Sequence, residues 1–261
     1  MSFQPIVDQK QQIQSQALSS INLTLEGLPS KGRAYPDGAE VSYTPYTFGE
    51  IKKISQSNVS EREYLEFVVS GIKTNFDQLL ITISDLMYIG LLRKISSLGK
   101  SKFSLKSNCV SCKKENSIDF TLANLDFDDL EVELPLIFDL ERDSGQTYEF
   151  HFSPVTLGDF YHLIETDLSS DIIAVLASCC RNMDFQDSYD IFSSFTLAEA
   201  EYMNEVDKYL YHGVKPLPTT CAFCKKEFKI NLEVGQTLVL PFRGDKEPPK
   251  GRIRFGIQAR N

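Results

Sequence analysis

The sequence predicts an α+β fold, in which an internally duplicated helical unit with small strands and hairpins is joined by a pair of cysteine knuckles. Three observations lead to this prediction. The pattern Cys-x-x-Cys-Lys-Lys-Glu begins at Cys109 and again at Cys221. Alternating apolar residues follow each copy, as in a half-buried strand. Helix-capping and turn residues precede each copy in the same order.

The composition is typical of a globular protein rather than of a membrane or nucleic-acid-binding one. The 261 residues are 42% hydrophobic and 24% charged, which is enough chain and apolar material for a sizeable core. No apolar run approaches a membrane span, and the net charge of −9 argues against nucleic acid as the main partner. With no secretory leader we expect a cytoplasmic protein, whose six cysteines serve as metal ligands or buried thiols.

The chain begins with a polar segment at residues 1–20, rich in glutamine and serine, for which we expect a flexible arm that becomes ordered against a partner. The alternation at 21–25 predicts the first strand. Glycine and proline then crowd residues 27–38, which predicts an extended loop. This loop lacks the GxxxxGK[ST] spacing of a phosphate-binding loop.

Three helices are predicted in the first copy, after a strand at 40–47. The first helix is expected to reach about Asn58, and the third ends at Gly99, a residue suited to the left-handed position after a helix. Each helix is opened by a capping pattern, in which a hydroxyl precedes a carboxylate by three residues. The pairs are Thr47 with Glu50, Ser60 with Glu63, and Thr82 with Asp85.

The same order returns in the second copy. A strand at 147–154 precedes a cap at Thr156, an apolar helix is predicted at 169–180, and a further capped helix at 196–213. The difference in residue number between equivalent positions of the two copies is nearly constant. It changes only between elements, where loops accept insertions. The separation is 109 for Pro45/Pro154, Gly49/Gly158 and Ser60/Ser169, 114 for Thr82/Thr196 and Gly99/Gly213, and 112 for Cys109/Cys221.

This duplication predicts the division of the chain. A hairpin is expected from strands at 136–140 and 148–152. Carboxylates crowd residues 119–143, whereas the chain after Arg243 is basic, so the tail is either solvated or docks on an acidic partner surface. The predicted parts are an arm at 1–20, a first repeat at 21–135, a second repeat at 136–242 and a basic tail at 243–261.

Two Cys-x-x-Cys pairs supply four thiolates, the number that a closed tetrahedral zinc site needs. We therefore predict one structural Zn²⁺ bound as in a zinc ribbon, with the neighbouring lysines partly offsetting the charge of the centre. Four sulfur ligands leave no position for water, which argues against a catalytic metal. The predicted ligands are Cys109, Cys112, Cys221 and Cys224.

Other interpretations of the cysteines stay open. The four thiols could be unligated or redox-active, and two subunits could exchange knuckles. Cys179 and Cys180 lie in an apolar helical stretch and are predicted to be core residues.

No catalytic motif accompanies the knuckles. The histidines His151, His162 and His212 stand in no motif; the first is expected on the polar face of a strand and the other two on helix surfaces. The sequence contains no HExxH, nucleophile elbow, GxGxxG or Walker loop, so it predicts a protein that is not an enzyme.

Several stretches resemble the T4-type bacteriophage baseplate hub family. They are the Leu-Pro-Ser-Lys-Gly-Arg-Ala-Tyr-Pro loop at 28–36, the Thr-Phe-Gly-Glu cap at 47–50, and Asp-Leu-Met-Tyr-Ile-Gly-Leu-Leu-Arg at 85–93 before a glycine and a Cys-x-x-Cys. The resemblance covers residues 21–135 well and the second copy more loosely, since that copy lacks the loop and has no arginine matching Arg93.

The resemblance implies a structural or assembly component of the hub of a contractile-tail baseplate, present in the host cytoplasm during assembly and then in the virion. Its partners would be other baseplate and tail proteins, contacted through the N-terminal arm, the basic tail and the 27–38 loop. The alternative is a zinc-ribbon nucleic-acid-binding or transcription-associated factor, against which the negative charge argues.

Overall fold

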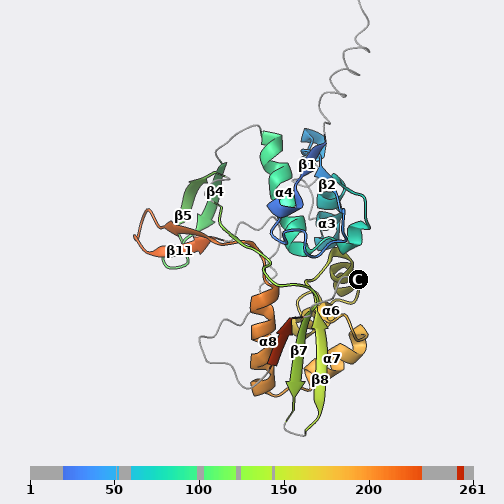
Figure 1. The fold of residues 1–261 in the computed structure, drawn as a ribbon. Coiled ribbons are helices and arrows are strands. Elements are labelled where there is room, and N and C mark those ends of the chain that lie inside the picture. Colours follow the sequence, from blue (N-terminus) through green and yellow to red (C-terminus); the bar gives the residue numbers. More distant parts are fainter. Residues whose placement is uncertain are drawn as a thin grey trace, which may run out of the picture.

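The computed structural model describes residues 20–50, 52, 60–98, 103–121, 125–142, 145–230 and 252–255. Figure 1 shows an N-terminal lobe, a C-terminal lobe and a pair of hairpins to one side of the N-terminal lobe. Helices and short antiparallel strands are both present, which confirms the predicted α+β class. The predicted arm at 1–20 lies outside the described residues except for its last residue. Within the described part of the chain, no helix is long and apolar enough to cross a membrane.

The N-terminal lobe is a three-stranded antiparallel sheet covered by helices. Its strand order is β1-β2-β3, with Leu23 opposite Val41 and Val41 opposite Thr74. The long helix α4 and the shorter α3 bury Leu86, Ile89 and their apolar neighbours against the sheet. The elements are β1 (Ile21–Leu23), η1 (Leu25–Gly27), β2 (Val41–Tyr43), α3 (Glu61–Val69), β3 (Ile72–Thr74), η2 (Gln78–Leu80) and α4 (Ile83–Leu98).

The C-terminal lobe contains the predicted hairpin. β7 pairs with β8 in antiparallel register, and β12 adds to the other side of β7, with Arg252 opposite Asp139. Residues 252–255 of the predicted tail are therefore a strand of this sheet; the rest of the tail lies outside the described residues. The elements are β7 (Leu136–Glu141), β8 (Thr147–Phe152), α5 (Leu157–Glu165), α6 (Ile172–Cys179), α7 (Phe185–Ser193), α8 (Leu197–Leu210) and β12 (Arg252–Phe255).

The two lobes share helices across the predicted boundary between repeats. Helix α5 packs Leu157, Phe160 and Leu163 into the core of the N-terminal lobe. Helix α6 contributes Val175 to that core and Cys179 to the core beneath β7 and β8. Cys180 joins the second core, as expected for both cysteines. The first helices of the predicted second repeat therefore pack on the N-terminal lobe.

Local capping chemistry accounts for most helix starts. Reciprocal capping boxes open α3, α5 and α8 at Ser60, Thr156 and Thr196. Thr47 and Glu50 exchange the same two hydrogen bonds, although most of the helix predicted to Asn58 lies outside the described residues. The predicted start at Ser169 is wrong, because the Asp171 side chain caps α6 instead.

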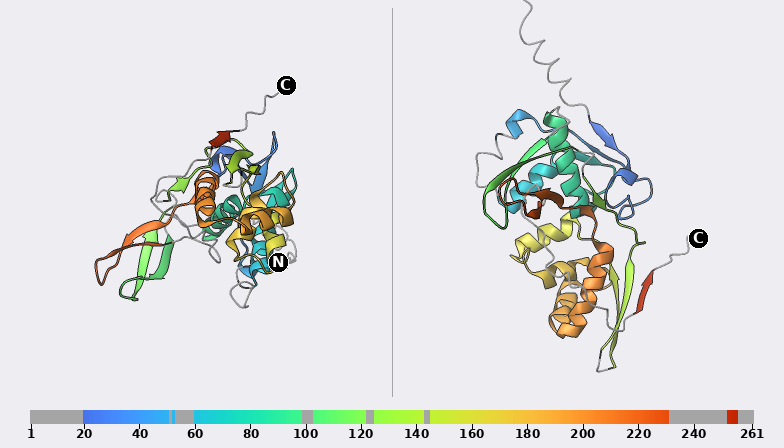
Figure 2. Two further views of the ribbon diagram at one scale, coloured as in Figure 1. Left: turned by 90° about the horizontal axis from the view of Figure 1, so that it is seen from below. Right: turned by 90° about the vertical axis from the view of Figure 1, so that its left-hand side faces the viewer.

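Two antiparallel hairpins complete the chain. β4 (Phe103–Asn108) pairs with β5 (Glu115–Phe120), and β10 (Leu217–Thr220) pairs with β11 (Glu227–Ile230). A short pairing of β6 (Phe127–Asp128) with β9 (Gly213–Val214) joins the segments that leave and enter these hairpins. Figure 2 shows the hairpins projecting from the lobes, with their loops at the outer end.

Candidate metal centre

The two cysteine knuckles have the same backbone conformation. In the first, the Cys109 N–H donates to the Lys114 carbonyl at 3.0 Å and the Lys113 N–H donates to the Cys109 carbonyl at 2.8 Å. In the second, Cys221 pairs with Lys226 and Lys225 at 2.9 and 3.0 Å. Lys113 and Lys225 both adopt a left-handed conformation, with φ of 60° and 61°. Each hairpin therefore turns its two cysteines toward one side of the loop.

The four cysteines predicted as ligands are brought together across the hairpins. The Sγ atoms of Cys109 and Cys224 are 3.7 Å apart, and those of Cys112 and Cys221 are 3.6 Å apart. All four sulfur atoms lie within 4.8 Å of one another, and the cysteines are free thiols. A tetrahedral zinc ion with Zn–S bonds of about 2.3 Å requires sulfur atoms about 3.8 Å apart. The arrangement therefore has the size and the donor set of a four-thiolate metal centre.

Backbone amides favour the thiolate form at the first cysteine of each knuckle. Hydrogen bonds from the Cys224 and Phe223 amides lower the pKa of Cys221 to about 6, against the opposing effect of burial. The Cys112 and Ser111 amides lower the pKa of Cys109 in the same way. At Cys112 the Lys114 amide also lowers the pKa, but burial and the neighbouring sulfur atoms outweigh it and raise the value to about 11. Metal ligands must be deprotonated, so the amide hydrogen bonds that lower the pKa of Cys109 and Cys221 favour metal binding at these two residues.

Asn116 connects the two knuckles beside the sulfur atoms. Its side-chain amide donates to the Lys114 carbonyl at 2.9 Å, and its carbonyl oxygen accepts from the Ala222 N–H at 2.9 Å. The residue is 5% exposed, so neither bond has water as an easy substitute. Sequence reasoning missed Asn116 because the equivalent position in the second copy holds Phe228, which packs with Ile230 beneath the sulfur atoms.

Within the described part of the chain, the four cysteines are the one group of three or more cysteines, histidines and carboxylates close enough to share a metal ion. His151 contacts Glu149 at 2.9 Å, and His162 lies edge-on to Phe185. The prediction that His212 is a helix-surface residue is wrong. It follows α8 and is 3% exposed, because its ring contacts Thr82 of the first lobe.

The loop at 27–38 is fixed to the N-terminus of α4. The Ser30 N–H and the Tyr35 hydroxyl donate to the two carboxylate oxygens of Asp85, at 2.9 and 2.5 Å. The Asp85 carboxylate therefore holds the loop in place. The Asp85 N–H still donates to the Thr82 hydroxyl, as in the predicted cap. Ser30 is fully buried, whereas Lys31 is exposed and pairs with Asp129. Only part of this loop is therefore available to a partner.

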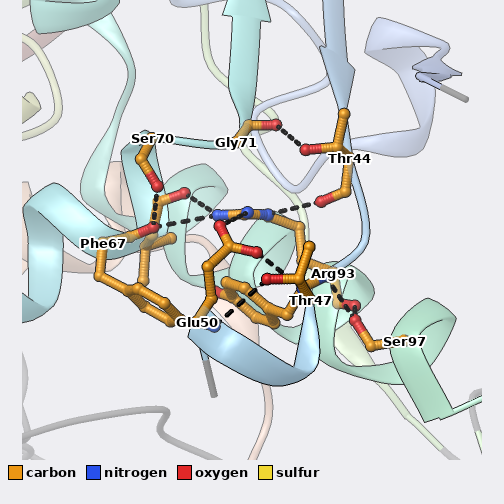
Figure 3. A network of polar contacts seen from close by, with 10 residues as sticks. Thr44, Thr47, Glu50, Phe67, Ser70, Gly71, Arg93 and Ser97 are labelled. Carbon is orange, nitrogen blue, oxygen red and sulfur yellow. Dashed lines mark hydrogen bonds and ion pairs between the residues drawn. The ribbon is translucent and has the colours of Figure 1, made fainter. Parts of the chain in front are cut away.

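A second polar network surrounds Arg93, whose side chain is fully buried (Figure 3). Its guanidinium donates to the carbonyls of Thr44, Phe67 and Val68 at 2.6–3.1 Å. It also lies over the ring of Tyr46 and 3.7 Å from Glu50. Burial lowers the arginine pKa, an effect that Tyr46 and Glu50 oppose. These contacts join the end of α3 to β2, which is a structural role.

Taken together, the fold and site define an α+β protein whose one clustered set of metal-type ligands, among the described residues, is a closed four-thiolate group. A family model described as T4 bacteriophage base plate protein matches residues 20–238. The chain therefore belongs to this family of phage baseplate proteins, which confirms the predicted resemblance. Separate comparisons with curated proteins and with solved structures gave no match.

Proposed function

We propose that this protein is a structural or assembly component of the central hub of a contractile-tail phage baseplate, and that it acts by binding other baseplate and tail proteins. The family match over residues 20–238 is the observation that supports it most strongly. A protein of this kind needs rigid surfaces rather than a reactive group. Buried polar networks at Arg93 and Asp85 supply rigidity of that kind in the N-terminal lobe.

The same proposal includes a structural Zn²⁺ at Cys109, Cys112, Cys221 and Cys224. The sulfur separations of 3.6 and 3.7 Å support it, as do the lowered pKa values of Cys109 and Cys221. The ion would join hairpins that are 112 residues apart in the chain, and would leave no ligand position open for catalysis. The shared knuckle conformation also supports an internal duplication, with repeats at 21–135 and 136–242 and a basic tail beyond.

Deletion of the gene from the phage tests the role in assembly. The protein would act in the host cytoplasm, and either stay in the tail or leave after assembly. We expect lysates without tailed particles, and baseplates whose central part is missing while outer parts still form. Electron microscopy of the lysates, with the gene supplied in trans as the control, reports this directly. Normal tails without the protein would refute the proposal.

The second candidate is a zinc-ribbon nucleic-acid-binding or transcription-associated factor, which the four lysines of the knuckles favour. Binding to DNA or RNA that weakens steeply with salt would support that function. This second function is excluded if the purified protein does not bind nucleic acid and the phage that lacks the gene fails to assemble tails. Those two results together would support the baseplate role.

A further inference from the structure

The outer end of the paired hairpins exposes apolar side chains that a stable fold does not require there. Val110 is 66% exposed and Phe223 is 56% exposed, although each adjoins a cysteine of the centre. Cys109 and Cys221 are completely buried beside them. Figure 2 shows that these loops point away from both lobes, so the described parts of the lobes do not cover them. We call the exposed surface formed by Val110, Phe223, Lys113, Lys114, Lys225 and Lys226 the knuckle tip.

The knuckle tip is a composite of the two hairpins. The Lys114 ammonium of the first knuckle lies 4.8 Å from the ring centre of Phe223 in the second. Asn116 also bonds the two loops together, through the Lys114 carbonyl of the first and the Ala222 N–H of the second. The apolar and basic groups therefore form one surface while the clustered cysteines and Asn116 hold the two loops side by side.

The charges of the knuckle tip indicate the chemistry of its partner. Four exposed lysines lie on the two loops that carry these apolar side chains and outnumber the exposed Glu115 and Glu227 beside them, whereas the whole chain has a net charge of −9. An acidic partner segment would be attracted to this end and repelled by the rest of the molecule. The lysines also offset the charge of a metal–thiolate centre, but that role does not require Phe223 or Val110 to face solvent.

We propose that the knuckle tip is a docking surface for an acidic, partly apolar segment of another baseplate protein, and that docking requires the metal-bound centre. This inference depends on the proposed function, because the metal holds the two loops in one surface. The partner's carboxylates would meet the lysines, and its apolar side chains would cover Val110 and Phe223.

The test uses the full-length protein loaded with zinc and a fluorescent peptide that alternates glutamate and leucine. A peptide alternating lysine and leucine and a single-stranded oligo-dT are the comparison probes. The test variant is Val110→Ser with Phe223→Ser, which leaves every cysteine in place. Leu197→Ser, at an 89% exposed leucine on α8, is the matched control. Zinc content is measured for each protein before binding is measured by fluorescence anisotropy.

We expect the acidic peptide to bind the wild type and the control alike, and the double variant about tenfold more weakly at unchanged zinc content. Chelation should abolish binding to the wild type. The proposal is overturned if the acidic peptide does not bind, if the double variant binds it as well as the wild type, or if oligo-dT binds more tightly. A zinc-free wild-type protein would refute the metal part of the proposed function separately, because zinc content is its own readout.

Discussion

Thr82 and His212 lie 130 residues apart in the chain and share a buried hydrogen bond of 3.2 Å between Oγ1 and Nε2. The other ring nitrogen, Nδ1, is 2.7 Å from the Leu210 carbonyl, to which only an N–H can donate. Nε2 of a neutral His212 then accepts from the Thr82 hydroxyl, which itself accepts from the Asp85 N–H. The end of α8 is thereby joined to the start of α4.

Replacing His212 with leucine should destabilise the protein by about 1–3 kcal/mol, because the Leu210 carbonyl and the Thr82 hydroxyl lose their buried partner. Urea unfolding measures the change. His151→Gln is the control, since His151 is partly exposed and contacts Glu149 at the surface. Equal midpoints for the two variants would contradict a structural role for the Thr82–His212 bond.

Gly71→Ala should cost about 1–3 kcal/mol of stability, because an added Cβ would lie 1.9 Å from Nη2 of Arg93. The control is Gly49→Ala, where the nearest atom is 4.0 Å away. Thermal unfolding of both variants checks the difference. In an Arg93→Met background the cost of Gly71→Ala should fall, and an unchanged cost would show that the arginine is not the obstacle.

Cys224→Ser should abolish zinc binding and make stability insensitive to chelators, whereas chelation should destabilise the wild type. Hydrogen exchange should show lost protection in β10, β11, β4 and β5, while the two lobes keep theirs because their cores are separate from the cysteine cluster. Cys179→Ser is the control, since that thiol is buried in a lobe and should leave zinc content unchanged. Full zinc content in Cys224→Ser would refute the four-ligand centre.

Acid should weaken the contact between β7 and α8. Arg142 donates to the Glu199 carboxylate at 2.8 Å, and this bond, with the Thr196 amide, lowers the pKa of Glu199. An unfolded glutamate has a pKa of about 4.3, so the stabilisation is present above that pH and is lost as pH falls through the lower folded value.

In the Glu199→Gln variant, the free energy of unfolding should therefore fall less steeply with decreasing pH below about pH 4.3 than in the wild type. Denaturant unfolding at a series of pH values measures the slope. Glu201→Gln makes the same charge change at an exposed position of α8 and should leave the slope unaltered. If both variants follow the wild-type curve, the Arg142–Glu199 pair does not stabilise the fold.

Local rules were enough to predict many elements from sequence. The capping boxes at Ser60, Thr156 and Thr196, the β7–β8 hairpin and the strands after each knuckle follow from residues adjacent in the chain. The clustering of the four cysteines also followed, because their spacing has a specific chemical use. Whether the two halves descend from one duplicated unit stays a prediction.

Features set by distant contacts could not be predicted. From sequence alone His212 is expected on a helix surface, and only the contact with Thr82 of the other lobe explains its burial. Asn116 bridges the knuckles with no counterpart in the second copy. In each case tertiary packing, rather than local preference, selects the position.

The order in which the chain is made adds a consequence of the paired knuckles. Cys109 and Cys112 emerge from the ribosome long before Cys221 and Cys224, and α5 to α8 lie between them in the sequence. While the intervening helices are synthesised, Cys109 and Cys112 supply only two of the four ligands that the metal centre needs. The centre can be completed only after the chain has been translated through Cys224 and has folded back on itself, so products truncated before Cys221 would lack the finished knuckle tip.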